Sequence, residues 1–100
     1  LVKALVHITG GGLPENMPRV LPKGIGANIN LGSWPMPPLF QLVSELSTLD
    51  TDELYRTLNM GVGMVVIVAP EHVNAVQDSI DETTWIIGEL TSDHNKVLLK

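Results

Sequence analysis

The sequence contains no cysteine and few basic residues. Without cysteine, the chain has no disulfide framework and no thiolate chemistry, which is compatible with a reducing cytosol without establishing one. Six Lys and Arg stand against eleven Asp and Glu, for a formal net charge of -5, and the basic residues are scattered along the chain. This balance argues against nucleic acid or an anionic membrane as a partner.

Long apolar runs are also missing. The longest extends from Met64 to Ala69, far short of the roughly 20 residues that cross a bilayer. The chain begins at Leu1 within an apolar segment and has no basic region typical of a signal peptide. We therefore expect it to be an excised piece of a longer protein.

The 100 residues have room for one small domain, and 44% of them are apolar, enough for a modest core. Apolar or alternating runs bounded by turn residues predict strands, and apolar residues at spacings of three and four predict helices. The expected strands are 4–8, 26–31, 64–68, 84–90 and 96–99. The expected helices are 39–46, 51–58, one beginning at Pro70, and a short one within 13–21 that Pro18 limits to one or two turns before a kink. This order predicts an α/β (α+β) domain in which helices pack on a mixed sheet.

Three of these elements carry more specific predictions. The consecutive apolar residues of 64–68, mostly β-branched, predict a central strand covered on both faces. Asp50, with Glu53 three residues later, predicts a capped start for the helix that follows. The helix 39–46 has one apolar stripe, typical of a helix that packs on a core, formed by Leu39, Leu42, Val43 and Leu46.

The candidate site is the segment His7–Asn16, with the sequence HITGGGLPEN. An apolar run ends in three glycines and then Pro14, which predicts a strand, a turn and a helix with Pro14 in its first position. Glycines let backbone N–H groups approach a ligand, and a helix N-terminus adds unpaired donors, so the turn suits a phosphate or carboxylate. It lacks the GxxxxGK[ST] and GxGxxG nucleotide patterns. A tight corner without a ligand is the alternative.

Histidine is the usual general base or metal ligand near neutral pH. His7 is the only polar residue in its apolar strand, and is either a structural histidine in the core or at an edge, or a ligand contact. We expect His72, on a solvated helix face, and His94, in a polar turn, to carry no chemistry. No set of His, Asp and Glu has the spacing of metal ligands, so no metal site is expected.

Other candidate residues leave alternatives open. Arg19 either reaches back to a bound anion or is simply solvated. The second glycine-bearing turn, Asn59–Gly63, is more typical of a helix C-cap than of a ligand loop. Trp34, next to Pro35, either packs on the core or covers a cleft. We identify no complete set of catalytic residues.

The segment from His7 to Pro22 (HITGGGLPENMPRVLP) is similar to the hallmark stretch of phosphoribosylformylglycinamidine cyclo-ligases, also called aminoimidazole ribonucleotide synthetases. Further motifs of that family follow in the same order, at Trp34-Pro35, Pro38-Leu39-Phe40, 53–64 (ELYRTLNMGVGM) and Trp85-Ile86-Ile87-Gly88. The resemblance extends over essentially all 100 residues.

The resemblance implies the fold of the C-terminal domain of this superfamily, which is partly ferredoxin-like. Residues 1–100 would be the latter part of that ribotide-contacting domain, and the N-terminal ATP-binding domain would be absent from them. The family's enzyme uses ATP and magnesium to close formylglycinamidine ribonucleotide to aminoimidazole ribonucleotide in de novo purine biosynthesis. We expect a cytoplasmic homodimer for the full enzyme. The isolated piece should be inactive and hold no cofactor tightly, since ATP and magnesium are bound mostly by the missing domain.

By the same resemblance, the ribotide, and most directly its phosphate, would be contacted by Thr9, Gly10, Gly11 and Gly12. His7 and Asn16 would line the same cleft, with Arg19 further away. Two alternatives remain. One is a free-standing anion-binding or protein-interaction module without catalysis, and the other is a superfamily synthetase or kinase with a different phosphorylated substrate, such as thiamine phosphate.

Overall fold

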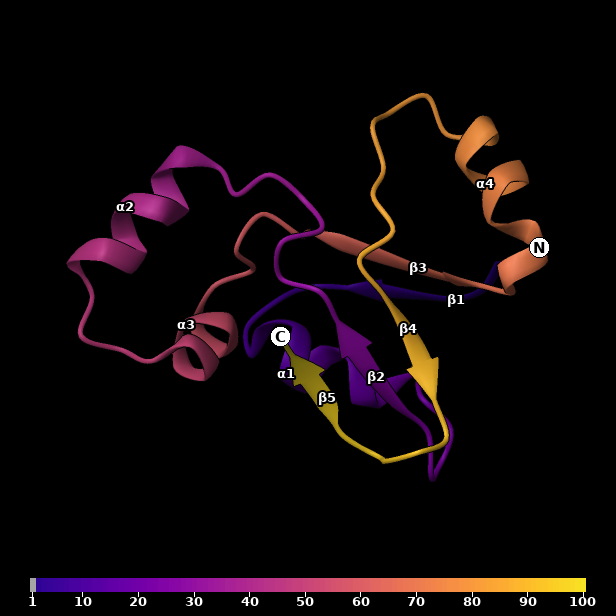
Figure 1. Ribbon diagram of the computed structural model, residues 1–100, viewed down its shortest axis with the longest axis horizontal. Helices are drawn as coiled ribbons and strands as arrows, with labels where there is room; N and C mark the ends of the chain where they lie inside the picture. Colours follow the sequence, from indigo (N-terminus) through magenta and orange to yellow (C-terminus); the bar gives the residue numbers. More distant parts are fainter. Residues whose placement is uncertain (1) are drawn as a thin grey trace.

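In a computed structural model, which describes residues 2–100 apart from the side chain of Asp52, the strands pair in two small sheets (Figure 1). The elements in chain order are β1 (Val2–His7), α1 (Gly12–Asn16), the 3-10 turn η1 (Met17–Arg19), β2 (Gly26–Ile29), α2 (Pro38–Leu46), α3 (Thr51–Thr57), β3 (Met64–Val68), the 3-10 turn η2 (Pro70–His72), α4 (Val73–Ser79), β4 (Gly88–Thr91) and β5 (Val97–Leu99). This mixture of helices and strands confirms the predicted α/β (α+β) class.

The two sheets differ in their pairing. β1 and β3 are antiparallel, with His7 opposite Met64 and Val2 opposite Val68, and the register shifts between Val2 and Ala4. In the other sheet β2 lies between β4 and β5, antiparallel to the first and parallel to the second. β4 and β5 are consecutive in the sequence, but they are separated in space by β2. This sheet is mixed, as expected.

β3 is not the central strand that its apolar run predicts. Within residues 2–100 it pairs only with β1, and Met64 at its start is more than half exposed. The strand β1 is buried on one face only, because Val6 is buried whereas Leu5 is 58% exposed on the opposite face. A two-stranded sheet with the core on one side leaves the alternate residues in solvent, so continuous apolar runs are no proof of burial on both faces.

The expected strand 84–90 begins later than its sequence predicts. β4 starts at Gly88, which lies opposite Ile29, the last residue of β2. Since β2 ends there, residues 84–87 have no ladder partner in this sheet, although the Asn30 N–H still donates to the Ile87 carbonyl at 2.7 Å. The partner strand therefore sets the start of β4.

One buried cluster connects both sheets to α1 and α3. Leu13 of α1 and Met60 are its largest fully buried side chains. The Trp34 indole N–H donates to the Met60 carbonyl at 3.1 Å, and the Trp34 ring meets Tyr55 edge to face, with 6.5 Å between centroids. Trp34 thus packs in the core, and it also lines a cavity beside β3, so its two alternatives are not exclusive.

α2 forms where the spacing predicts, but its apolar stripe does not pack as predicted. The helix lies at one end of the molecule, away from both sheets (Figure 1). Phe40 and Val43 are half-buried against the core. The leucines at the other stripe positions, Leu39, Leu42 and Leu46, are 66%, 51% and 77% exposed. α2 therefore has one apolar face against the core and a second one in solvent.

α3 begins as predicted, because an Asp50 Oδ1 accepts a hydrogen bond from the Glu53 N–H at 2.9 Å. Arg56 lies in its last turn, as expected, and its guanidinium is 3.9 Å from the Glu53 carboxylate in an exposed pair that contributes little to stability. α1 packs against this helix. None of the helices in residues 2–100 has the length and apolar character needed to cross a membrane.

Candidate functional site

The predicted glycine loop connects the end of β1 to α1. The Ile8 N–H donates to the Gly63 carbonyl at 2.9 Å, and the Gly12 N–H closes the loop on the Thr9 carbonyl at 3.0 Å. α1 begins at Gly12, so the prediction that Pro14 occupies the first helical position is wrong by two residues. The left-handed Gly11 and Gly12 (φ 96° and 61°) turn the chain into the helix early.

Asn16 holds this loop together from inside. Its side chain is 3% exposed, and its Nδ2 donates to the carbonyls of Gly12, Thr9 and Gly10 at 2.8, 3.2 and 3.4 Å. Its Oδ1 accepts from the Thr9 hydroxyl at 3.0 Å and from Arg19 Nη1 at 3.4 Å. The single buried amide therefore satisfies polar groups from both ends of the loop.

The three loop positions differ in whether the structure requires glycine there. A Cβ on Gly12 would overlap the Tyr55 carbonyl oxygen of α3, and one on Gly11 would overlap the Glu15 side chain. A Cβ on Gly10 would meet no atom within 4 Å. Gly10 is exposed, as is Thr9, and within residues 2–100 the N–H groups of Gly10 and Gly11 donate no hydrogen bond. Gly12 is thus required by packing, whereas Gly10 lies open to a ligand.

His7 and Arg19 flank the loop differently. His7 is exposed at the end of β1, on the face opposite Val6, so the core alternative for His7 is wrong. Arg19 is exposed and its guanidinium is joined to the loop through Asn16. The structure therefore brings Thr9, the glycines, Asn16 and Arg19 into one hydrogen-bonded unit, with His7 next to it in the chain.

The second glycine turn, Asn59–Gly63, connects α3 to β3 and is hydrogen-bonded to the start of the glycine loop. The Asn59 Oδ1 accepts from the Gly61 N–H at 2.9 Å, and Met60, fully buried, has a left-handed backbone with φ 54°. Gly61 (φ 96°) packs against the Pro37 ring. The carbonyl of Gly63 then receives the Ile8 N–H, so this turn fixes where the Thr9–Gly12 loop starts.

His94 connects two parts of the chain through hydrogen bonds. Its Nδ1 accepts the Lys96 N–H at 3.2 Å, which in neutral imidazole leaves Nε2 protonated to donate to the Asn28 Oδ1 at 2.9 Å. These bonds attach the turn after β4 to β2. Tyr55 lies behind Gly12, and burial raises the pKa of its hydroxyl above the usual 10.0.

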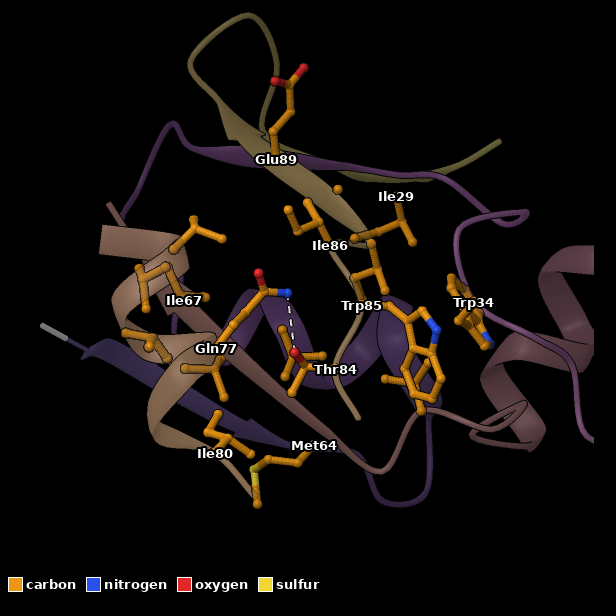
Figure 2. Close-up of a pocket in the computed structure, with 18 of the residues that line it drawn as sticks. Ile29, Trp34, Met64, Ile67, Gln77, Ile80, Thr84, Trp85, Ile86 and Glu89 are labelled. Carbon is orange, nitrogen blue, oxygen red and sulfur yellow. Dashed lines mark hydrogen bonds between the residues drawn. The ribbon is translucent and has the colours of Figure 1, made fainter. Parts of the chain in front are cut away.

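A cavity of about 620 Å³ lies away from the glycine loop, between β3, α4 and the segment 82–90 (Figure 2). Its walls are mostly apolar, with Met64, Ile80 and Trp85 among them, and the Gln77 amide donates to the Thr84 hydroxyl at 3.1 Å on one side. The predicted ribotide-contacting residues from His7 to Arg19 do not line it, whereas Trp34 and the second glycine turn, at Gly61 and Gly63, do. Sequence reasoning did not locate this cavity. Its signals were Trp34, for which covering a cleft was one alternative, and the apolar Trp85-Ile86-Ile87 run placed just after an amphipathic helix.

The carboxylates of the described chain do not gather. Within residues 2–100 no group of three or more His, Asp or Glu side chains could hold a metal ion together. The donor set of these residues therefore does not fit a magnesium site by itself.

Comparison with known proteins gives one family and a set of close relatives. Residues 1–100 match the family model described as AIR synthase related protein, C-terminal domain. The chain is 46% identical over 100 residues to the phosphoribosylformylglycinamidine cyclo-ligase of Brevibacillus brevis, covering 97% of the chain and 29% of the relative. It is 44% identical to the protein of that name from a Thermoanaerobacter species, covering 98% and 30%. The chain thus spans less than a third of the length of the relatives it matches.

Proposed function

This chain belongs to the AIR synthase related family through its C-terminal domain, and on that premise we propose that it is the latter part of the C-terminal domain of a phosphoribosylformylglycinamidine cyclo-ligase. Relatives that carry this name match over nearly all of the chain. In the proposed reaction, formylglycinamidine ribonucleotide is closed to aminoimidazole ribonucleotide in purine biosynthesis. The full enzyme would use ATP and magnesium, act as a homodimer and work in the cytoplasm.

The role of residues 1–100 in this enzyme is to hold the phosphorylated ribotide. The observation that carries this proposal is the Thr9–Gly12 loop, which exposes Thr9 and Gly10 while the buried Asn16 fixes its backbone. The Gly10 and Gly11 N–H groups, which donate no hydrogen bond within residues 2–100, suit the oxygens of a phosphate. A loop already in one conformation loses little entropy on binding, which favours accurate positioning.

His7 and Arg19 extend this surface. Arg19 offers the remaining N–H groups of its guanidinium to an anion, since one nitrogen is used by Asn16. His7 is exposed at the end of β1, two residues before Thr9, where it would meet the sugar or the base precursor. Asn16 supports the loop from the protein side.

An NMR titration of the ¹⁵N-labelled chain tests the loop assignment. Formylglycinamidine ribonucleotide is expected to shift the amide signals of Thr9 to Gly12, whereas thiamine phosphate at the same concentration is expected to shift them less. If the ribotide shifts only amide signals around the cavity between β3, α4 and the segment 82–90, the assignment is contradicted. A larger shift with thiamine phosphate would favour the alternative substrate class.

The isolated chain is expected to be inactive, because it spans less than a third of the length of its relatives and the ATP and magnesium site is proposed to lie in the rest of the enzyme. Incubation with the ribotide, ATP and magnesium should give no aminoimidazole ribonucleotide above the level of a blank without protein. Turnover by residues 1–100 alone would contradict the proposal that they are one part of a larger catalytic unit.

A further inference from the structure

We infer that the Thr9 side chain accepts a hydrogen bond from the bound ligand and does not donate one. This inference rests on the proposed function, because it states which chemical group of a phosphorylated sugar Thr9 meets. It assigns Thr9 Oγ to a hydroxyl or N–H of the ligand, and leaves the phosphate oxygens to the backbone N–H groups of Gly10 and Gly11.

The first step is the orientation of the Asn16 amide. Three backbone carbonyls, those of Gly12, Thr9 and Gly10, face one end of the amide at 2.8 to 3.4 Å. Carbonyl oxygens only accept, so the group that faces them is the NH₂ of Asn16. A reversed amide would set its oxygen against three others. The Asn16 oxygen therefore faces Thr9 and Arg19.

The second step is the position of the Thr9 proton. An amide oxygen has lone pairs and no proton, so the Thr9 hydroxyl, 3.0 Å away, must donate to it. A hydroxyl has one proton to give. Asn16 is 3% exposed and is bonded on both ends, so it does not turn away to release that proton without breaking the loop.

The consequence is a loop with two polarities. Thr9 is an exposed residue, and its hydroxyl oxygen has only lone pairs left to offer, which repel phosphate oxygens and attract the hydroxyl or N–H groups of a ligand. The N–H groups of Gly10 and Gly11 are hydrogen-bond donors and attract phosphate oxygens. A ligand with a phosphate at one end and donors next to it, such as a ribose phosphate, matches both, whereas inorganic phosphate matches only the second.

Two probes and two variants test this assignment. Ribose 5-phosphate and inorganic phosphate are titrated into the ¹⁵N-labelled chain, and Kd is read from the Gly10 and Gly11 amides. Thr9→Val keeps the shape but removes the acceptor, so Kd for ribose 5-phosphate should rise about tenfold while that for inorganic phosphate changes less than twofold. Thr9→Ser, which keeps the hydroxyl, should hold both values within about threefold.

Each other outcome overturns the inference. Equal weakening of both probes in Thr9→Val would mean that Thr9 serves the phosphate or acts only by holding the loop through Asn16, and no change for either would mean that it meets no ligand. Rapid solvent exchange of the Asn16 side-chain NH₂ protons would remove the premise about its orientation. If neither probe shifts the Gly10 and Gly11 amide signals of the unsubstituted chain, the ribotide-binding proposal fails as well. The two Thr9→Val outcomes, by contrast, overturn only the assignment of Thr9.

Discussion

The Thr9–Asn16 segment and helix α2 are both short, but they differ in what they bury and what they expose. The first buries a polar side chain, Asn16, and gives every part of its amide a partner. The second leaves apolar side chains such as Leu46 in solvent. A buried amide without partners costs several kcal/mol, whereas an exposed leucine costs the folded state almost nothing relative to the unfolded chain. Stability therefore depends on the first segment far more than on the second.

The largest expected effect concerns Gly12. Gly12→Ala should lower the free energy of unfolding by about 3 kcal/mol or more, because the new methyl group meets the Tyr55 carbonyl and the backbone is left-handed there. Gly10→Ala is the matched control in the same loop and should change it by less than about 0.5 kcal/mol. Urea unfolding followed by circular dichroism measures both, and equal losses would show that the loop glycines are not distinguished by packing.

A smaller contrast is expected within α2. Phe40→Ala should cost about 1 to 2 kcal/mol, since its ring is half-buried against the core. Leu39→Ala, one residue earlier but mostly exposed, should cost less than about 0.5 kcal/mol. The same urea assay reports the difference. A greater loss for Leu39 would mean that the outer leucine face of α2 is covered in solution.

The smallest expected effect is a pH dependence at Tyr55. Since burial raises the pKa of Tyr55 above 10.0, its protonated form stabilises the folded chain fully below about pH 10, and this contribution is lost as the pH rises through the folded-state pKa. Tyr55→Phe has no such proton, so its stability relative to the unsubstituted chain should improve only above pH 10. A difference that stays constant from pH 8 to 11 would contradict the assignment.

Local signals in the sequence were sufficient for several features of the fold. The Asp50 cap depends on two residues three apart, and the alternation in 26–31 depends on neighbours, so both were predicted and β2 buries Ala27 and Ile29 as expected. These interactions are short-range and are encoded within one turn or one strand. The helix predicted over 39–46 was found for the same reason, as α2. The helix predicted from Pro70 begins as the 3-10 turn η2 and continues as α4 from Val73.

The features that could not be predicted from the sequence depend on long-range contacts. Whether α2 packs through Val43 or through Leu42 depends on where the core lies, and all of these residues are apolar. The position of β3 depends on its pairing partners, which no local pattern specifies. At the candidate site, the glycines and Asn16 were picked out from the motif, but the network of Asn16 with Thr9 and Arg19 requires the folded loop.

The two-stranded sheet has a practical consequence for handling this chain. Within residues 2–100, β3 pairs with β1 on one side only, so its other edge presents backbone groups with no strand partner. Met64–Val68 is uncharged, free of proline and mostly β-branched, the composition from which cross-β fibrils grow. Concentrated samples should therefore bind amyloid dyes with time, and a lysine placed at Val66 should slow that process.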